Sequence, residues 1–269
     1  MTYAPGMPPR VVSLSPAATE ILAHIGGAGL LMGVMHDPIT LQGPTAPRIA
    51  PVQLSSLRPD ILIDIIEPDA TPTMSHDAHR RVLRFSPRTV EEILDAHTRI
   101  GEAVELEREA MHAVVRLRER LFTAAERVNP YVDGPAVAVI VGSDPIRIGG
   151  DWIPQLVERA GAVHSLNPTV PSPRSGAAAG PQHAERRAGP DVEASETDFL
   201  RSLPEAVLIA PRRGDAATIV SDLARRSWWQ DLPAVRKKRV SVLADPSVLT
   251  RPGPRVVEAF EQLVEWLNH

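Results

Sequence analysis

The chain has 269 residues, of which 43% are hydrophobic and 23% charged, and its formal net charge is −4. This size fits one large α/β domain or two lobes, and the composition is that of a globular protein. The balanced charges and the few aromatic residues argue against nucleic acid as a partner. The absence of cysteine excludes disulfides, thiolate metal sites and a cysteine nucleophile.

The beginning of the chain carries neither a basic nor an apolar segment, so the sequence predicts no signal peptide. No apolar run reaches the roughly 18 residues that a membrane-crossing helix needs. We therefore expect a protein that is not embedded in a membrane and is cytoplasmic as the sequence stands. The alternative is a periplasmic or otherwise extracytoplasmic protein whose start is truncated.

The first part of the chain alternates between strand and helix signals. Residues 10–15 form a short β-branched run, and a helical pattern follows from Pro16 to the glycine at Gly26. Ser15 suits the N-cap of this helix, and proline is well tolerated at its first position. Residues 1–88 are predicted to form one α/β lobe with about four strands. The further strands, apolar on both faces as in a buried parallel sheet, are expected at 30–35, 60–66 and 81–85.

A long stretch without helix breakers follows this lobe. Residues 89–129 contain no proline and a single glycine, Gly101. Apolar residues recur there at three- and four-residue steps, as in an amphipathic helix. One helix of this length would extend over about 60 Å, enough to join two lobes. We expect one unbroken lobe-spanning helix, and the interpretation as a ligand-capturing protein is made to depend on it.

The pattern of strand, loop and helix begins again after this stretch, so residues 130–269 are predicted to form a second α/β lobe. Asp151 is expected to cap a helix over 153–160. Residues 166–195 are predicted to form a loop without elements of its own, either the rim of a binding site or a tolerated insertion. The remaining elements are expected to be strands at 136–141, 206–210 and 240–244 and a terminal helix at 254–267.

Motifs of common enzyme classes are absent, because the chain contains no GxxxxGK[ST], GxGxxG, HExxH or GxSxG sequence. Ser15 lacks the glycines of a nucleophile elbow, so a capping role is favoured over catalysis. His76 and His79 have the i, i+3 spacing of a helical metal site, but no third ligand is identifiable and a solvated face explains them better. We expect no catalytic residue, no metal ion and no intrinsic cofactor.

Other residues have positions that suit ligand contact. His36 and Asp37 follow the second predicted strand, and open α/β sheets bind ligands at the carboxyl ends of their strands. Trp152 opens a helix after two glycines, where an exposed indole would lie against a large apolar ligand; simple packing is the alternative. Of Trp228 and Trp229, we expect one to pack and the other to lie at a rim.

Several segments resemble, in order, the class III periplasmic-binding family, and in particular its cobalamin-binding members. They are 10–22, Gly33-Val34, His36-Asp37, 57–63, 85–94, 150–161, 232–236 and 251–255. The match covers nearly the whole chain except residues 166–195. The resemblance implies an α/β fold of two Rossmann-like lobes with central parallel sheets, joined by one long α-helix, and a ligand cleft between the lobes.

The resemblance also implies a function and a set of site residues. We expect a monomeric solute-binding protein of an ABC transporter, with cobalamin or another corrinoid as ligand, or else haem or a ferric siderophore. Arg251 is expected to pair with a ligand carboxylate or phosphate, or else to anchor the terminal helix. Glu67 and Glu196 are expected to dock on the permease, unless they are ordinary surface carboxylates. The other expected ligand contacts are Ser15, Pro16, His36, Asp37, Gly150, Asp151 and Trp152.

Some features depart from the cobalamin-binding pattern. The tyrosine-bearing turn that such members place after the His-Asp pair is missing, and few aromatic residues are available to line a pocket. The alternatives are a metal-dependent two-lobed enzyme and a degenerate, ligand-free interaction module. The enzyme would use His36, Asp37, His76 and His79.

Overall fold

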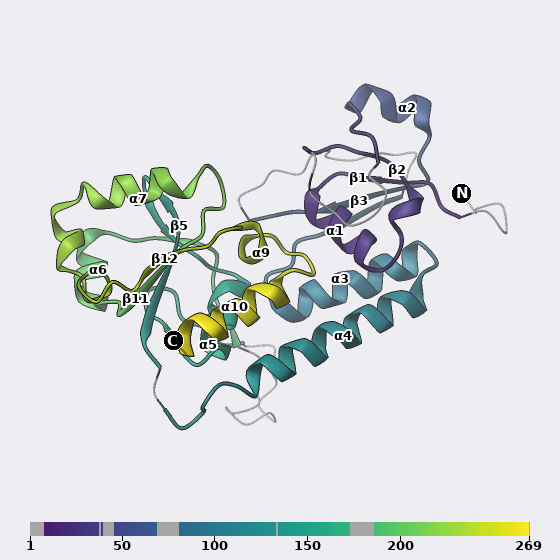
Figure 1. Ribbon diagram of the computed structural model, residues 1–269. Helices are drawn as coiled ribbons and strands as arrows, with labels where there is room; N and C mark the ends of the chain where they lie inside the picture. The colour runs from purple at the N-terminus through teal and green to yellow at the C-terminus, as the bar shows by residue number, and fades with distance from the viewer. Residues whose placement is uncertain are drawn as a thin grey trace. The chain divides into compact units, whose positions relative to one another are not determined.

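A computed structural model of the protein describes residues 8–37, 39, 46–68, 81–132, 134–172 and 186–268. The chain divides into two compact units and passes between them several times (Figure 1). The prediction of an α/β fold with two lobes is confirmed. Unit 1 comprises Met1–Pro87, Glu91–Glu119 and Pro252–Pro254, and unit 2 comprises Arg88–Val90, Arg120–Arg251 and Arg255–His269.

The sheet of unit 1 has four parallel strands in the order β2-β1-β3-β4, and the sequence predicts all of them. Val11 and Ile61 pack into one core cluster, whereas their neighbours Val12 and Leu62 pack into another. Alternate residues of a strand face opposite sides of a sheet, so both faces of this sheet are buried. The strands are β1 (Val11–Ser13), β2 (Leu31–Val34), β3 (Ile61–Ile65) and β4 (Arg81–Phe85).

Helix α1 (Pro16–His24) follows β1 directly, as predicted. Proline stands at its first position, and the chain leaves the helix through Gly26, whose φ of 84° suits glycine. Ile21 of α1 packs into the same cluster as Val11. The shorter helices of unit 1 are η1 (Ala28–Leu30), η2 (Pro51–Gln53) and α2 (Leu54–Leu57).

The prediction of one unbroken helix over 89–129 is wrong, because two helices occupy this stretch: α3 (Val90–Ala103) and α4 (Glu107–Ala125). At the end of α3, Glu105 adopts a left-handed conformation with φ of 63°. The Leu106 N–H then donates to the Gly101 carbonyl at 2.8 Å, which satisfies a terminal carbonyl of the helix. This end motif forms without glycine or proline at the turn, so no helix-breaking residue marks it in the sequence.

The chain reverses direction after α3. A Cβ on Gly101 would lie 2.3 Å from the Ala110 Cβ, so glycine allows the two helices to approach closely. Glu91 at the start of α3 pairs with Arg118 near the end of α4 at 2.7 Å, which makes the helices antiparallel (Figure 1). The 19 residues of α4 alone extend from unit 1 into unit 2 over about 28 Å. A helix therefore still joins the units, and the requirement of one 60 Å helix was too strict.

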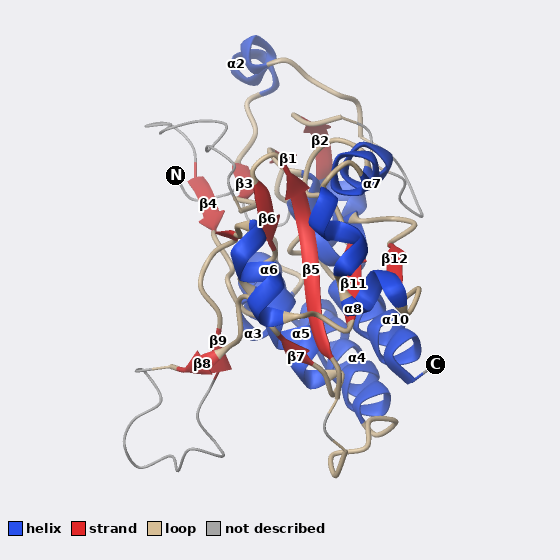
Figure 2. Cartoon of the chain, turned by 90° about the vertical axis from the view of Figure 1, so that its left-hand side faces the viewer, coloured by secondary structure: helices blue, strands red, loops and turns tan. Residues whose placement is uncertain are grey.

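The sheet of unit 2 is mixed, whereas a parallel sheet was expected. Strands β5, β11 and β12, labelled in Figure 2, are parallel. β6 is antiparallel to β5, and β10 is antiparallel to β6. β7 pairs with β5 outside this order. The strands are β5 (Ala136–Ser143), β6 (Ile146–Ile148), β7 (Val163–His164), β10 (Val192–Glu193), β11 (Ala206–Ile209) and β12 (Val240–Val242).

The described part of 166–195 contains elements, so the prediction of a loop without any is wrong. β8 (Val170–Pro171) and β9 (Arg186–Arg187) form a two-stranded antiparallel sheet, and β10 joins the edge of the main sheet. These strands have two residues each, which is too short for a periodic signal in the sequence.

Helices pack on both faces of this sheet. Trp228 and Trp229 both lie in the cluster under β5 and β11, each 6% exposed, so the expectation that one lies at a rim is wrong. The helices are α5 (Trp152–Arg159), α6 (Glu196–Ser202), α7 (Ala216–Ala224), η3 (Ser227–Asp231), α8 (Pro233–Arg236), α9 (Ser247–Thr250) and α10 (Val256–Asn268).

No helix among the described residues is both long enough and apolar enough to cross a membrane.

Candidate functional site

In unit 1, a chain of hydrogen bonds lies at the carboxyl ends of β1 and β2. The Ser13 hydroxyl donates to the Ser15 carbonyl at 2.9 Å, and the Thr19 hydroxyl donates to Ser13 Oγ at 2.7 Å. Thr19 Oγ1 is also 2.7 Å from His36 Nε2, and His36 Nδ1 is 2.7 Å from the Asp37 carbonyl. The sequence missed Ser13 and Thr19, although Ser13 ends a buried strand just as the predicted residues do.

Ser15 and Asp37 lie in different surroundings. Ser15 occupies the N-cap position of α1, but its hydroxyl accepts the Ile65 N–H at 2.9 Å and does not cap the helix. It is 7% exposed, so its hydroxyl fixes the end of β3 against β1. Asp37 is exposed and pairs with Arg48 at 2.9 Å. Pro16 is half-buried at the start of α1.

In unit 2, Asp151 precedes α5 with φ of 58°. Its side chain does not cap the helix, so the expected capping role is wrong. Its carboxylate is 1% exposed and pairs with Arg88 at 2.8 Å and with Arg212 at 3.8 Å. Burial raises the pKa of the Asp151 carboxyl, and the hydrogen bond from Arg88 opposes that rise. The carboxylate therefore binds the segment before α3 to the start of α5.

The expectation of an exposed Trp152 indole is wrong. The side chain is 0% exposed, and its Nε1–H donates to the Leu249 carbonyl at 2.7 Å. This carbonyl belongs to α9, so Trp152 connects the starts of α5 and α9 inside unit 2. An indole after a Gly-Gly pair looks exposed in the sequence, but packing from α9 covers it.

The backbone N–H groups before α5 are already bonded within the protein. Gly150 N–H donates to Asp191 Oδ1 at 2.8 Å, and Asp151 N–H donates to the Gly189 carbonyl at 2.8 Å. A Cβ on Gly150 would lie 2.5 Å from that same carbonyl oxygen, so a close backbone contact requires this glycine. The structure thus gives Gly150 a packing role.

A buried ion pair that the sequence analysis missed holds this region together. Arg212 donates from Nε and Nη2 to the two oxygens of Asp191 at 2.6 and 2.7 Å, and the two side chains are 9% and 1% exposed. Arg212 also donates to the Thr250 carbonyl at 3.0 Å and lies over the Trp152 ring at 5.4 Å. Arg212 could have been found from the sequence, because it lies just beyond the predicted strand at 206–210. Asp191 could not, because it lies in the stretch 166–195 that was predicted to be a loop.

Both sheets carry polar residues at the carboxyl ends of parallel strands, and known proteins share this arrangement of strands and helices. No family model matches the chain. The Roseiflexus sp. RS-1 periplasmic heme-binding protein RhuT superimposes with a TM-score of 0.74 at 18% identity, over 97% of this chain and 98% of that one. The Vibrio cholerae periplasmic vitamin B12 binding protein BtuF gives 0.65 at 20% identity, over 97% of each chain. The chain has the class III periplasmic-binding-protein fold.

A curated relative is consistent with this fold. The Bacillus subtilis (strain 168) protein YvrC, described as an uncharacterized ABC transporter substrate-binding lipoprotein, is 24% identical over 283 aligned positions. The alignment covers 96% of this chain and 79% of the relative. The resemblance noted in the sequence is therefore confirmed at the level of the class III fold, without a preference for cobalamin.

The other predicted site residues differ in how exposed they are. Arg251 is half-buried just after α9, and Glu196 is exposed as the first residue of α6. Glu67 is half-buried beyond β3. His76 and His79 lie outside the described residues. Within the described ranges, no three His, Asp or Glu side chains gather closely enough to hold a metal ion.

Proposed function

We propose that the chain is the substrate-binding protein of an ABC transporter and that its ligand is a corrinoid, haem or ferric siderophore. The main support is the class III fold over nearly the full length of both chains, shared with proteins named for heme and vitamin B12. The substrate-binding relative from Bacillus subtilis supports the same role. These relatives are described as binding proteins, in agreement with the expectation that the chain is not an enzyme.

His36 of unit 1 and Arg251 of unit 2 are the residues we favour for direct ligand contact. His36 is half-buried and lies at the carboxyl edge of the unit 1 sheet, and its ring nitrogens contact Thr19 Oγ1 and the Asp37 carbonyl. Arg251 is half-buried just after α9. Both are suited to the carboxylate or phosphate groups that such ligands carry. Ser15, Pro16 and Asp37 are proposed to surround His36.

In unit 2, Gly150, Asp151 and Trp152 are proposed to support ligand binding without touching the ligand through their side chains. Support comes from their burial and from the protein partners that already occupy their polar groups. Glu67 and Glu196 remain the proposed permease-docking carboxylates. Glu196 has the exposed position that docking needs, whereas Glu67 is half-buried and therefore less accessible.

The ligand is tested by incubating the protein with cyanocobalamin, hemin or a ferric hydroxamate, desalting it and recording the visible spectrum. We expect one of these chromophores to remain at about one molecule per chain. His36→Ala and Arg251→Met should each weaken retention about tenfold, the effect of one lost charge-assisted hydrogen bond. Arg201→Met, on the exposed side of α6, is the matched control and should leave retention unchanged.

Two outcomes would contradict the proposal. If none of the chromophores is retained, the ligand-free interaction module becomes the better interpretation. If stoichiometric zinc or iron survives dialysis, the metal-dependent enzyme is favoured instead.

We also propose an extracytoplasmic location, which replaces the cytoplasmic expectation from the sequence. The curated relative is described as a lipoprotein, and the two solved structures above are described as periplasmic. Fractionation of the native cells should recover the protein outside the cytoplasmic membrane. Recovery in the cytosol would favour a role in ligand handling over uptake.

A further inference from the structure

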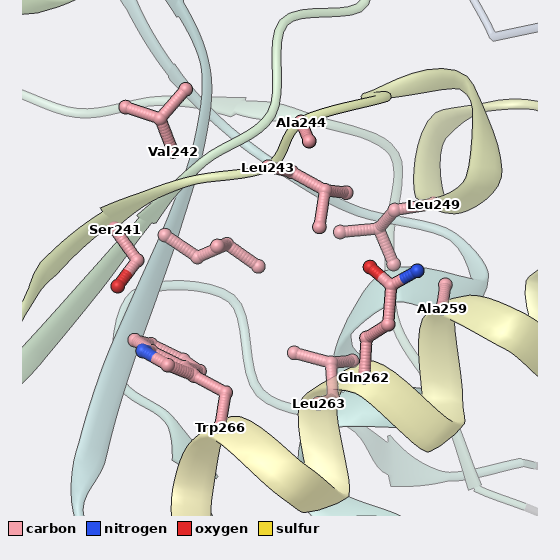
Figure 3. A pocket seen from close by; sticks show the side chains of 10 residues that line it. Ser241, Val242, Leu243, Ala244, Leu249, Ala259, Gln262, Leu263 and Trp266 are labelled. Carbon is pink, nitrogen blue, oxygen red and sulfur yellow. The ribbon is translucent and has the colours of Figure 1, made fainter.

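Unit 2 contains a pocket that none of the proposed ligand contacts lines. It has a volume of about 300 Å³ and lies between the edge strand β12, the following segment, α9 and α10 (Figure 3). Leu243 and Leu249 form one side, and Leu263 and Trp266 of α10 form the other. The walls come from β11, β12, α9 and α10, which all belong to unit 2, so the pocket belongs to the fold of that unit itself.

The size and lining of the pocket define the chemistry of a ligand. An apolar cavity of about 150 Å³ holds benzene, so about 300 Å³ admits a two-ring molecule. Most of the lining is aliphatic, and the Trp266 indole offers a flat ring surface. Figure 3 shows the Gln262 amide pointing from α10 toward Leu243 and Leu249.

Gln262 gives the apolar pocket a polar group. One of its N–H groups donates to Glu258 at 3.1 Å, and an amide side chain has a second N–H and an acceptor oxygen. A pocket with mostly apolar walls and a few polar groups, here Gln262 and Ser241, is typical of small-molecule sites. We infer that this pocket binds a small bicyclic aromatic molecule carrying one hydroxyl or comparable hydrogen-bonding group.

The pocket is connected to the residues around the start of α5. Leu249 contributes its side chain to the pocket and its carbonyl to the Trp152 Nε1–H, and the next carbonyl, that of Thr250, accepts from Arg212. A ligand against Leu249 therefore acts on the same short helix that holds Trp152 and Arg212. Occupancy of the pocket shifts α9 and is sensed at the Trp152 indole.

The inference is tested on the full chain with 2-naphthol, with naphthalene as the analogue that lacks the hydroxyl. Indole N–H signals of the four tryptophans are followed by two-dimensional ¹H–¹⁵N NMR and assigned by single Trp→Phe variants. We expect saturable shifts at Trp266, which lines the pocket, and at Trp152, which reports on α9. Trp228 and Trp229 lie in the cluster under β5 and β11 and should stay unchanged.

Pocket variants supply the controls. Ala244→Phe and Val242→Phe place a ring at the exposed rim of the pocket, so each should weaken 2-naphthol binding at least tenfold without unfolding the protein. Ala217→Phe, at an exposed position of α7, is the matched control and should bind as the unaltered chain does. Gln262→Leu should remove the preference for 2-naphthol over naphthalene, which we expect to be about tenfold.

Several results would overturn the inference. These are shifts that do not saturate, shifts of equal size at all four tryptophans, and rim variants that bind as well as Ala217→Phe. Binding without movement of the Trp152 signal would refute the connection through α9. None of these outcomes bears on retention of the chromophores, so this site and the proposed transport function fail separately.

Discussion

Two histidines, His97 in unit 1 and His164 in unit 2, are 0% exposed in the interior of the protein. Burial lowers the pKa of each from 6.5 to about 4. The His97 Nδ1 bonds to the Ile93 carbonyl at 2.8 Å, whereas neither ring nitrogen of His164 has a hydrogen-bond partner in the described part of the chain. Both rings are therefore neutral when the protein is folded near pH 7.

These depressed pKa values predict acid sensitivity. The unfolded state binds protons at pH 6.5, whereas the folded state resists them until about pH 4, so stability is full above pH 6.5 and falls as the pH drops toward 4. We expect a loss of about 2–3 kcal/mol per histidine over this interval, measured by urea unfolding at several pH values. His164→Phe should remove about half of the combined loss. The exposed His112→Phe should not change it, and equal slopes for all three proteins would contradict the prediction.

The buried pair of Arg212 and Asp191 predicts a large effect of a single substitution. Arg212→Met leaves the Asp191 carboxylate buried without its bidentate partner, so the free energy of unfolding should fall by about 3–5 kcal/mol. Arg236→Met removes a pair of the same length, 2.7 Å to Asp231, whose two side chains are about two-thirds exposed. That control should cost at most about 1 kcal/mol. Chemical denaturation of both variants tests the contrast, and similar losses would show that the burial of the first pair is unimportant.

Among the elements, the end of α3 depends on a residue in an unfavourable conformation. Glu105 is exposed and has φ of 63°, which glycine adopts without the steric penalty of a Cβ. Glu105→Gly should therefore stabilise the protein by about 0.5–1 kcal/mol. Glu102→Gly makes the same change at an exposed position inside α3 and should destabilise it by about 1 kcal/mol. Thermal unfolding of the two variants should give shifts of opposite sign, and shifts of the same sign would refute the argument.

The contrast between α3 and the strands shows what the sequence could predict. The four strands of unit 1 were predicted because apolar runs such as 60–66 are buried on both faces and are bounded by turn residues. The end of α3 was not predicted, because a glutamate such as Glu105 rarely adopts the left-handed conformation that ends a helix. Strand β6 was not predicted either, because it has only three residues and turns back on β5 as an antiparallel strand.

The site was predictable only in part, for a related reason. The rule for parallel sheets led to His36, which bonds to Thr19 of α1, and Thr19 in turn donates to Ser13 at the end of β1. It did not reveal that Trp152 and Asp151 are buried, since burial there depends on α9 and on Arg88, both distant in the sequence. Position in the sequence pointed to His36 at a strand end but missed Ser13 and Thr19, to which it is connected. The exposure of such residues depends on tertiary packing.

At the scale of the whole molecule, the two units have separate cores but exchange short segments of chain. Arg88–Val90 belongs to unit 2 although the residues on both sides of it belong to unit 1. This segment is held by the pair of Arg88 with Asp151 at 2.8 Å and by the Val90 N–H, which donates to Gln155 at 3.0 Å. The rest of unit 2 is continuous from Arg120 except for three residues near the end of the chain.

This division predicts that most of unit 2 can fold alone. A fragment of residues 120–269 keeps the cluster under β5 and β11 and has the size of a typical domain, so it should unfold cooperatively. It loses Arg88 and should therefore be less stable than unit 2 in the intact chain. Arg88→Met in the intact chain should reproduce about 2 kcal/mol of that loss, because it leaves the buried Asp151 without its nearest cation. Circular dichroism and NMR dispersion of the fragment provide the measurement, and a disordered fragment would mean that the core of unit 2 depends on unit 1.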